Sequence, residues 1–166
     1  IWAFGTLKIN HPPLTSLIAN ESIRKITEFN SQSLANTIWA LATLKLNHPQ
    51  LISLIANESI NKISEFNSQG LANTIWALAT LKVNHSQLIT LIANESMKKI
   101  SQFNSQELAN IIWALATLKE YHPQLTNLIA IESLKKISQF NSQNLANTIW
   151  ALATLKINYP QLTTLI

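Results

Sequence analysis

The sequence predicts an all-α protein, an α-solenoid built from tandem helix-turn-helix repeats. The tryptophans follow one another at intervals of 37 residues, from Trp2 to Trp150, without insertion or deletion. Leu, Ile and Ala are frequent, only 2 glycines are present, and no segment alternates polar and apolar residues as a strand would. Units of this length cannot bury their apolar faces alone, so they stack on their neighbours.

The period defines one repeat array that spans residues 1–166. The first and last units are incomplete, so each end of the array presents an apolar face that a neighbouring unit would otherwise cover. We therefore expect end-to-end self-association through these faces. The predicted units are 1–30 (partial), 31–67, 68–104, 105–141 and 142–166 (partial).

Each unit is predicted to hold two helices joined by a turn. In the second unit, Ser31 is a good N-cap for a first helix, helix A, over 32–45. Asn67 suits a left-handed exit from the preceding helix. Pro49 follows the turn at the first position of helix B, which extends to about Phe66.

The two helices differ in how much of their surface is apolar. Helix A carries Leu34, Ile38 and Leu41 on one flank and Trp39 between alanines on another, a wide arc that suits a helix packed between neighbours. Helix B has one broad apolar face. We therefore predict helix A in the inner, concave layer and helix B in the outer layer, with the tryptophans in the core.

A narrow polar stripe remains on helix A, and stacking would align it from unit to unit. It holds an asparagine in most units, whose amide offers a donor and an acceptor to the edge of a base. In the alternative interpretation, each asparagine bonds its counterpart in the next unit and aligns the stack. The residues are Asn36, Asn73, Asn110 and Asn147, beside Thr37, Thr74, Ile111 and Thr148.

One position varies at the start of the repeated block LANTIWALATLK, which is otherwise changed only at Ile111. It is occupied by Ser33, Gly70, Glu107 and Asn144, one turn before the asparagine on the same stripe. We interpret this position as the place where each unit selects its base. The alternative is a tolerant first-turn site in water, where Glu107 would favour the helix dipole.

A lysine is predicted at the C-terminal end of helix A in every unit. Cations at a fixed pitch would neutralise successive phosphates and supply a salt-dependent, sequence-independent share of binding. The alternative is a cation that stabilises the C-terminus of its own helix. The lysines are Lys8, Lys45, Lys82, Lys119 and Lys156.

Composition argues against an enzyme, a metal centre and a bound cofactor. The chain has neither cysteine nor aspartate, so thiolate chemistry is excluded and the usual carboxylate sets are missing. One histidine per unit forms no metal cluster and is assigned to the turn. The net charge of +4 rests on only 12% charged residues, so an anionic partner must meet a localised row of cations. Glu and Lys four residues apart on helix B, such as Glu95 and Lys99, are expected to form surface pairs.

The motif NSQxLANTIWALATL, repeated every 37 residues and followed by HPQL, resembles the octotricopeptide and heptatricopeptide repeats over the whole chain. The period fits the heptatricopeptide variant better. The resemblance implies an α-solenoid that binds single-stranded RNA, with helix A facing the RNA and roughly one base per repeat. It also implies a role in organelle gene expression.

The sequence thus predicts a non-enzymatic module for single-stranded RNA, active in RNA processing, stability or translation. A protein- or peptide-interaction solenoid, acting as scaffold or effector, is the competing function, because low charge density also suits a peptide in the stripe. No apolar run of membrane-spanning length is present, so no membrane partner is expected. We expect an intracellular location, in an organelle or in bacterial or host cytoplasm.

Overall fold

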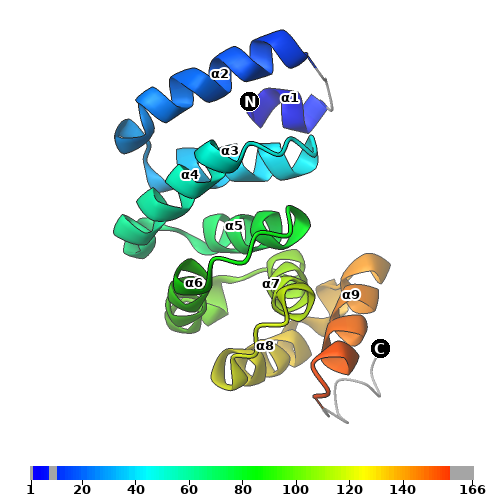
Figure 1. Cartoon of the computed structure of the whole chain (residues 1–166). Helices are drawn as coiled ribbons and strands as arrows, with labels where there is room; N and C mark the ends of the chain where they lie inside the picture. Colours follow the sequence, from blue (N-terminus) through cyan, green and yellow to red (C-terminus); the bar gives the residue numbers. More distant parts are fainter. Residues whose placement is uncertain (1, 8–10, 158–166) are drawn as a thin grey trace.

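The computed structural model describes residues 2–7 and 11–157 and confirms the all-α solenoid (Figure 1). Helices of two kinds alternate along the chain, and a short 3-10 turn follows each B helix. The A helices are α1 (Trp2–Leu7), α3 (Ser31–Thr43), α5 (Ser68–Thr80), α7 (Ser105–Leu118) and α9 (Ser142–Thr154). The B helices are α2 (Pro12–Arg24), α4 (Pro49–Asn61), α6 (Ser86–Lys98) and α8 (Pro123–Lys136). The 3-10 turns are η1 (Ile26–Glu28), η2 (Ile63–Glu65), η3 (Ile100–Gln102) and η4 (Ile137–Gln139).

The A helices form the inner layer of a curved array, as the sequence predicts. Each A helix packs along the next one, whereas successive B helices contact each other much less. Figure 1 shows the A helices along the inner side of the curve and the B helices along its outer side. Among the described helices, none is both long and apolar enough to cross a membrane.

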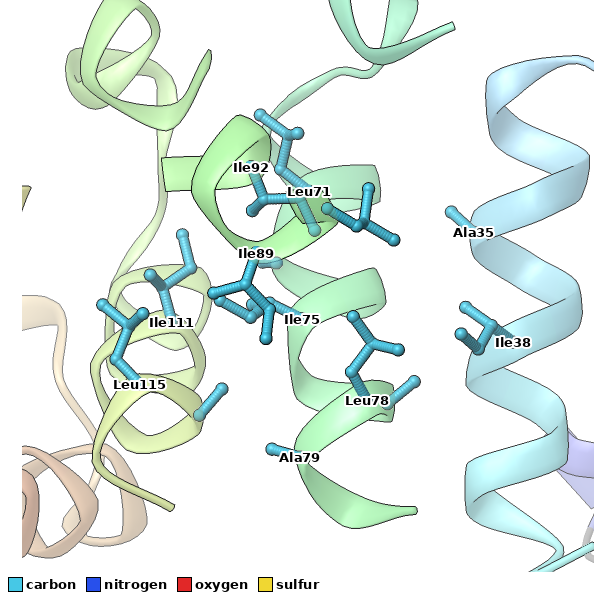
Figure 2. Packing of buried hydrophobic residues seen from close by; sticks show 14 of the residues in the cluster. Ala35, Ile38, Leu71, Ile75, Leu78, Ala79, Ile89, Ile92, Ile111 and Leu115 are labelled. Carbon is cyan, nitrogen blue, oxygen red and sulfur yellow. The ribbon is translucent and has the colours of Figure 1, made fainter. Parts of the chain in front are cut away.

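Each central A helix is covered on three sides. Ile75 and Leu78 of α5 are fully buried, with Ile38 of α3 on one side and Ile111 of α7 on the other. Ile89 of α6 covers the outer side (Figure 2). Burial of this kind contributes about 1.5–3 kcal/mol for each large aliphatic side chain. Only one narrow face of the helix is left accessible.

The A helices begin one residue earlier than the sequence predicts. Asn30, rather than Ser31, is the N-cap of α3, and its side chain accepts a hydrogen bond from the amide of Ser33 at 2.8 Å. Asn67 is likewise the N-cap of α5, with extended backbone rather than the predicted left-handed exit. The Ser31 hydroxyl instead donates to the carbonyl oxygen of Glu65 at the end of the same unit, at 3.1 Å.

The left-handed residue lies at the other end of the A helix. Lys45 has φ 54°, and the amide of Leu46 beyond it donates to the carbonyl of Leu41 at 2.9 Å, which closes a Schellman motif. Helix α3 therefore ends at Thr43 rather than at residue 45. The same conformation recurs at Lys82, Lys119 and Lys156.

The B helices begin as predicted and end earlier. Pro49 is the first residue of α4, and the Nδ1 atom of His48 accepts from the amide of Leu51 at 3.3 Å, so the histidine is the N-cap. The helix ends at Asn61, and turn η2 separates it from Phe66, which the sequence placed in the helix. Phe66 is extended and 1% exposed.

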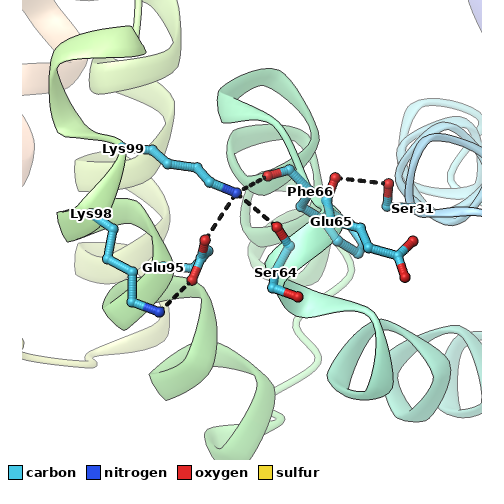
Figure 3. Close-up of polar contacts among 7 residues, drawn as sticks. All are labelled: Ser31, Ser64, Glu65, Phe66, Glu95, Lys98 and Lys99. Carbon is cyan, nitrogen blue, oxygen red and sulfur yellow. Dashed lines mark hydrogen bonds and ion pairs between the residues drawn. The ribbon is translucent and has the colours of Figure 1, made fainter.

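The expected Glu–Lys pairs of the B helices form, but three of them are largely buried, and their lysines also join neighbouring units (Figure 3). Lys99 binds Glu95 in its own helix at 2.9 Å. Its ammonium also donates to the carbonyl oxygens of Ser64 and Phe66 in the preceding unit, at 3.0 and 2.6 Å. Lys62 and Lys136 make the same contacts one unit away. We call Lys62, Lys99 and Lys136 the clamp lysines.

Candidate nucleic-acid interface

In the central A helices α5 and α7, a single stripe stays accessible on the concave side of the array. In α5 it consists of Gln69, Asn73, Trp76 and Thr80, while every residue from 70 to 79 other than Asn73 and Trp76 is buried. Steps of three or four residues place these side chains on one helical face. We call the set the inner stripe. It recurs as Gln32, Asn36, Trp39 and Thr43, as Gln106, Asn110, Trp113 and Thr117, and as Gln143, Asn147, Trp150 and Thr154.

The stripe asparagines have unused amides. Asn36, Asn73, Asn110 and Asn147 are half-buried, and within the part of the chain that the structure describes their side chains make no hydrogen bond. The alternative interpretation, in which each asparagine bonds its counterpart in the next unit, is therefore not what the structure shows. Each amide keeps a donor and an acceptor for a ligand on the concave surface.

The tryptophans lie on the inner stripe, which corrects their predicted place in the core. Trp76 and Trp113 pack against the core and are partly exposed, and Trp150 is 47% exposed. The ring centroids of Trp113 and Trp150 are 6.5 Å apart, with planes inclined at 38°. In the sequence pattern, Trp39 lies at the edge of the apolar arc of helix A. In the folded array, this edge of the helix stays accessible.

The variable position lies elsewhere than predicted. The amide of Glu107 donates to the Asn104 side chain, and the Glu107 carboxylate accepts from the Asn104 amide, both at 2.9 Å. This reciprocal pair is a capping box. Gly70, Glu107 and Asn144 are buried, and Ser33 is half-buried. The position serves the start of helix A, so we do not place it among base-contacting residues.

The neighbouring predicted residues are turned toward adjacent A helices. The hydroxyl of the half-buried Thr37 donates to the carbonyl of Ser33 at 2.7 Å, and that of Thr74 to the carbonyl of Gly70 at 2.8 Å. Thr74, Ile111 and Thr148 are at most 1% exposed. Because a helical residue advances 100°, the accessible stripe is rotated by about 65° from the predicted one. Thr74, Ile111 and Thr148 are therefore too buried to face a base, whereas Thr37 is half-buried.

Four lysines carry the unpaired positive charge of the described residues. Lys45, Lys82, Lys119 and Lys156 are exposed and have no ion pair there, and Lys8 lies outside the described residues. Every other described Lys or Arg lies 2.8–3.6 Å from a glutamate. We call these four the edge lysines, because they stand just past the C-terminal ends of stacked A helices, at one edge of the inner stripe.

The backbone of the edge lysines is strained. Their φ angles lie between 54° and 58°. A residue with a side chain costs about 1–3 kcal/mol in this region, and glycine usually occupies it at helix ends. If the position served only to end the helix, glycine would be favoured there. Helix termination therefore does not explain why lysine recurs at this position.

Carboxylates are absent from the inner stripe of the described units. Glu107 belongs to its capping box, and Glu120 accepts a hydrogen bond from the Asn84 side chain at 3.0 Å. The pKa of Glu95 is lowered by its hydrogen bonds from Lys98 and then Lys99, although burial opposes this. Glu132 has a pKa lowered in the same way by Lys135 and Lys136. Among the described residues, no glutamate forms an ion pair with a lysine beside the stripe.

One family model covers most of the chain. Residues 1–124 match the family model described as RNA-editing substrate-binding complex 6 protein. The chain belongs to this family. Residues 122–149 match a second model, a protein of unknown function (DUF1601), and a search of curated proteins finds no match. Membership of the RNA-editing substrate-binding complex 6 family supports the expected relation to RNA-associated helical repeat proteins. The octotricopeptide or heptatricopeptide type stays a prediction.

Proposed function

We propose that the chain is a non-enzymatic module that binds single-stranded RNA along its inner stripe and acts in RNA processing, stability or translation. The observation that carries the proposal is the row of unpaired, strained edge lysines beside unbonded asparagines and accessible tryptophans. Membership of a family named for an RNA-editing complex supports it. An organelle is the location that we favour.

Each complete unit offers one set of groups for one nucleotide. An edge lysine neutralises a phosphate, which supplies affinity without sequence preference. The asparagine amide bonds a base edge, and the tryptophan ring stacks on a base face. One set per helical repeat is a known way to read one base per repeat. Asn36, Asn73, Asn110 and Asn147 are the candidate base readers.

The charge favours RNA over the competing peptide ligand. Asparagine amides also bond extended peptides, but the edge lysines would then require an acidic peptide along the whole stripe. A nucleic-acid strand supplies a negative charge at every residue, which matches one edge lysine per unit. An acidic peptide is therefore the ligand to test in competition with RNA.

The test measures binding of the protein to labelled single-stranded RNA from a random pool at two salt concentrations. We expect binding that weakens with salt and that an acidic peptide of equal charge does not displace. Trp150→Leu should lower affinity about five- to tenfold, the lower part of the range for one stacked base. Tight binding of the peptide without binding of RNA would contradict the proposal.

A further inference from the structure

One turn of the array departs from the repeat. After the A helix, the second and third units carry Asn47 and Asn84 at the position that Tyr121 occupies in the fourth. Tyr121 is 58% exposed. An exposed tyrosine ring offers a flat apolar face and a polar tip, which asparagine at the same position in the other units does not.

The tyrosine lines a groove between the C-terminal ends of α7 and α9. Its volume is about 420 Å³, within the range of pockets that hold small ligands. The other lining residues include Lys119, Lys156 and Thr154. The groove therefore combines an exposed aromatic ring with two edge lysines from neighbouring units.

The nearby carboxylate forms no ion pair with these lysines. Glu120 precedes Tyr121, and its side chain accepts the hydrogen bond from Asn84, which belongs to the preceding unit. The groove lies on the other side, toward α9. Neither Lys119 nor Lys156 has an ion pair among the described residues.

We propose that this groove is a nucleotide subsite, in which a base stacks on Tyr121 while Lys119 and Lys156 hold the phosphates on its two sides. The inference rests on the proposed function and adds to it a fixed position for one nucleotide of the strand on the array. The edge lysines lead the strand along the array, and Tyr121 anchors one nucleotide at the edge of the fourth unit. Stacking on an aromatic ring is tolerant of base identity, so the subsite positions the strand rather than selects its sequence.

The test compares Tyr121→Asn, which restores the residue of the other units, with Tyr121→Phe, which keeps the ring. We expect Tyr121→Asn to lower affinity for single-stranded RNA at least fivefold with an unchanged salt slope, and Tyr121→Phe to bind as the parent. Irradiation of the parent with 4-thiouridine-labelled RNA should give a cross-link at Tyr121. Circular dichroism confirms that both variants are folded.

Each other outcome has a definite meaning. If the parent binds RNA but Tyr121→Asn binds equally well and no cross-link forms, the subsite is refuted and the proposed function stands. If the parent binds no RNA, both proposals fall. If adenosine or uridine monophosphate binds in a Tyr121-dependent way while RNA affinity does not depend on Tyr121, the groove holds a free nucleotide and the strand subsite is refuted.

Discussion

Two rows of lysine run through this array with the same period and opposite environments. The clamp lysines are 20–22% exposed, and each holds a glutamate together with two carbonyl oxygens of the preceding unit. The edge lysines are exposed, unpaired within the described chain and held in left-handed backbone. Periodicity alone therefore does not tell a structural cation from a binding one, whereas partners and backbone conformation do.

The largest expected effect comes from removing a clamp. Lys99→Met removes one of the two lysines that bind the buried Glu95 and leaves two carbonyl oxygens of the preceding unit without their charged donor, so it should cost about 2–3 kcal/mol of the free energy of unfolding. Lys98→Met is the matched control, because Lys98 binds the same carboxylate at 2.8 Å with a 70% exposed side chain. It should cost less than about 1 kcal/mol. Urea unfolding followed by circular dichroism measures the free energy of unfolding of both variants. Equal losses would show that Lys99 contributes no more to stability than the exposed Lys98.

Acid should weaken the ion pairs of the clamp lysines and should not affect the edge lysines. The pKa of Glu58 is lowered mainly by its hydrogen bond from Lys62, and those of Glu95 and Glu132 are lowered by theirs. A lowered pKa in the folded state means that the stability is present above the unfolded pKa of about 4.3 and is lost as the pH falls below it.

Thermal midpoints measured between about pH 6 and pH 3 should therefore fall at the acid end. A double variant with Glu95→Gln and Glu132→Gln should show a flatter decline from a lower starting value. An equally steep decline in that variant would assign the acid sensitivity to other groups.

The smallest effect concerns the variable position of helix A, which the sequence predicts to select the base. Glu107→Ser installs the residue of the second unit and removes one half of the capping box, which should cost about 0.5–1 kcal/mol of helix stability. Neither row of lysines is touched, so the sequence preference of bound RNA should not change. A selection experiment on both proteins checks this, and a preference altered at one base would restore the original interpretation.

The repeat period and the apolar arcs were sufficient to predict the fold and its two layers. They did not suffice to orient the inner stripe. Thr37 and Thr74 satisfy their hydroxyls on their own helix, so these polar residues can face a neighbouring helix at little cost. Trp39 is large enough to pack on the core and still reach the surface, as its partial exposure shows.

Two features depend on contacts that no local pattern contains. Lys99 meets carbonyls 33 and 35 residues earlier in the chain, whereas the sequence pattern shows only its partner four residues away. The left-handed helix end at Lys45 was missed because glycine is the usual signal for it. The asparagines and lysines of the candidate site were named from the sequence, and their role in binding stays a prediction. The accessible tryptophans and Tyr121 were identified only in the structure.

The most direct test replaces all four edge lysines with glycine and measures the salt dependence of RNA binding. The slope of log affinity against log salt should fall by up to about 2.8, at about 0.7 for each phosphate that is no longer neutralised. The thermal midpoint should stay equal or rise, because glycine relieves the strained backbone. The control removes four exposed charges of the outer helices, Arg24, Lys25, Lys98 and Lys135, and should keep the parent slope. An unchanged slope in the glycine variant, or an equal fall in the control, would contradict the assignment of the edge lysines to RNA.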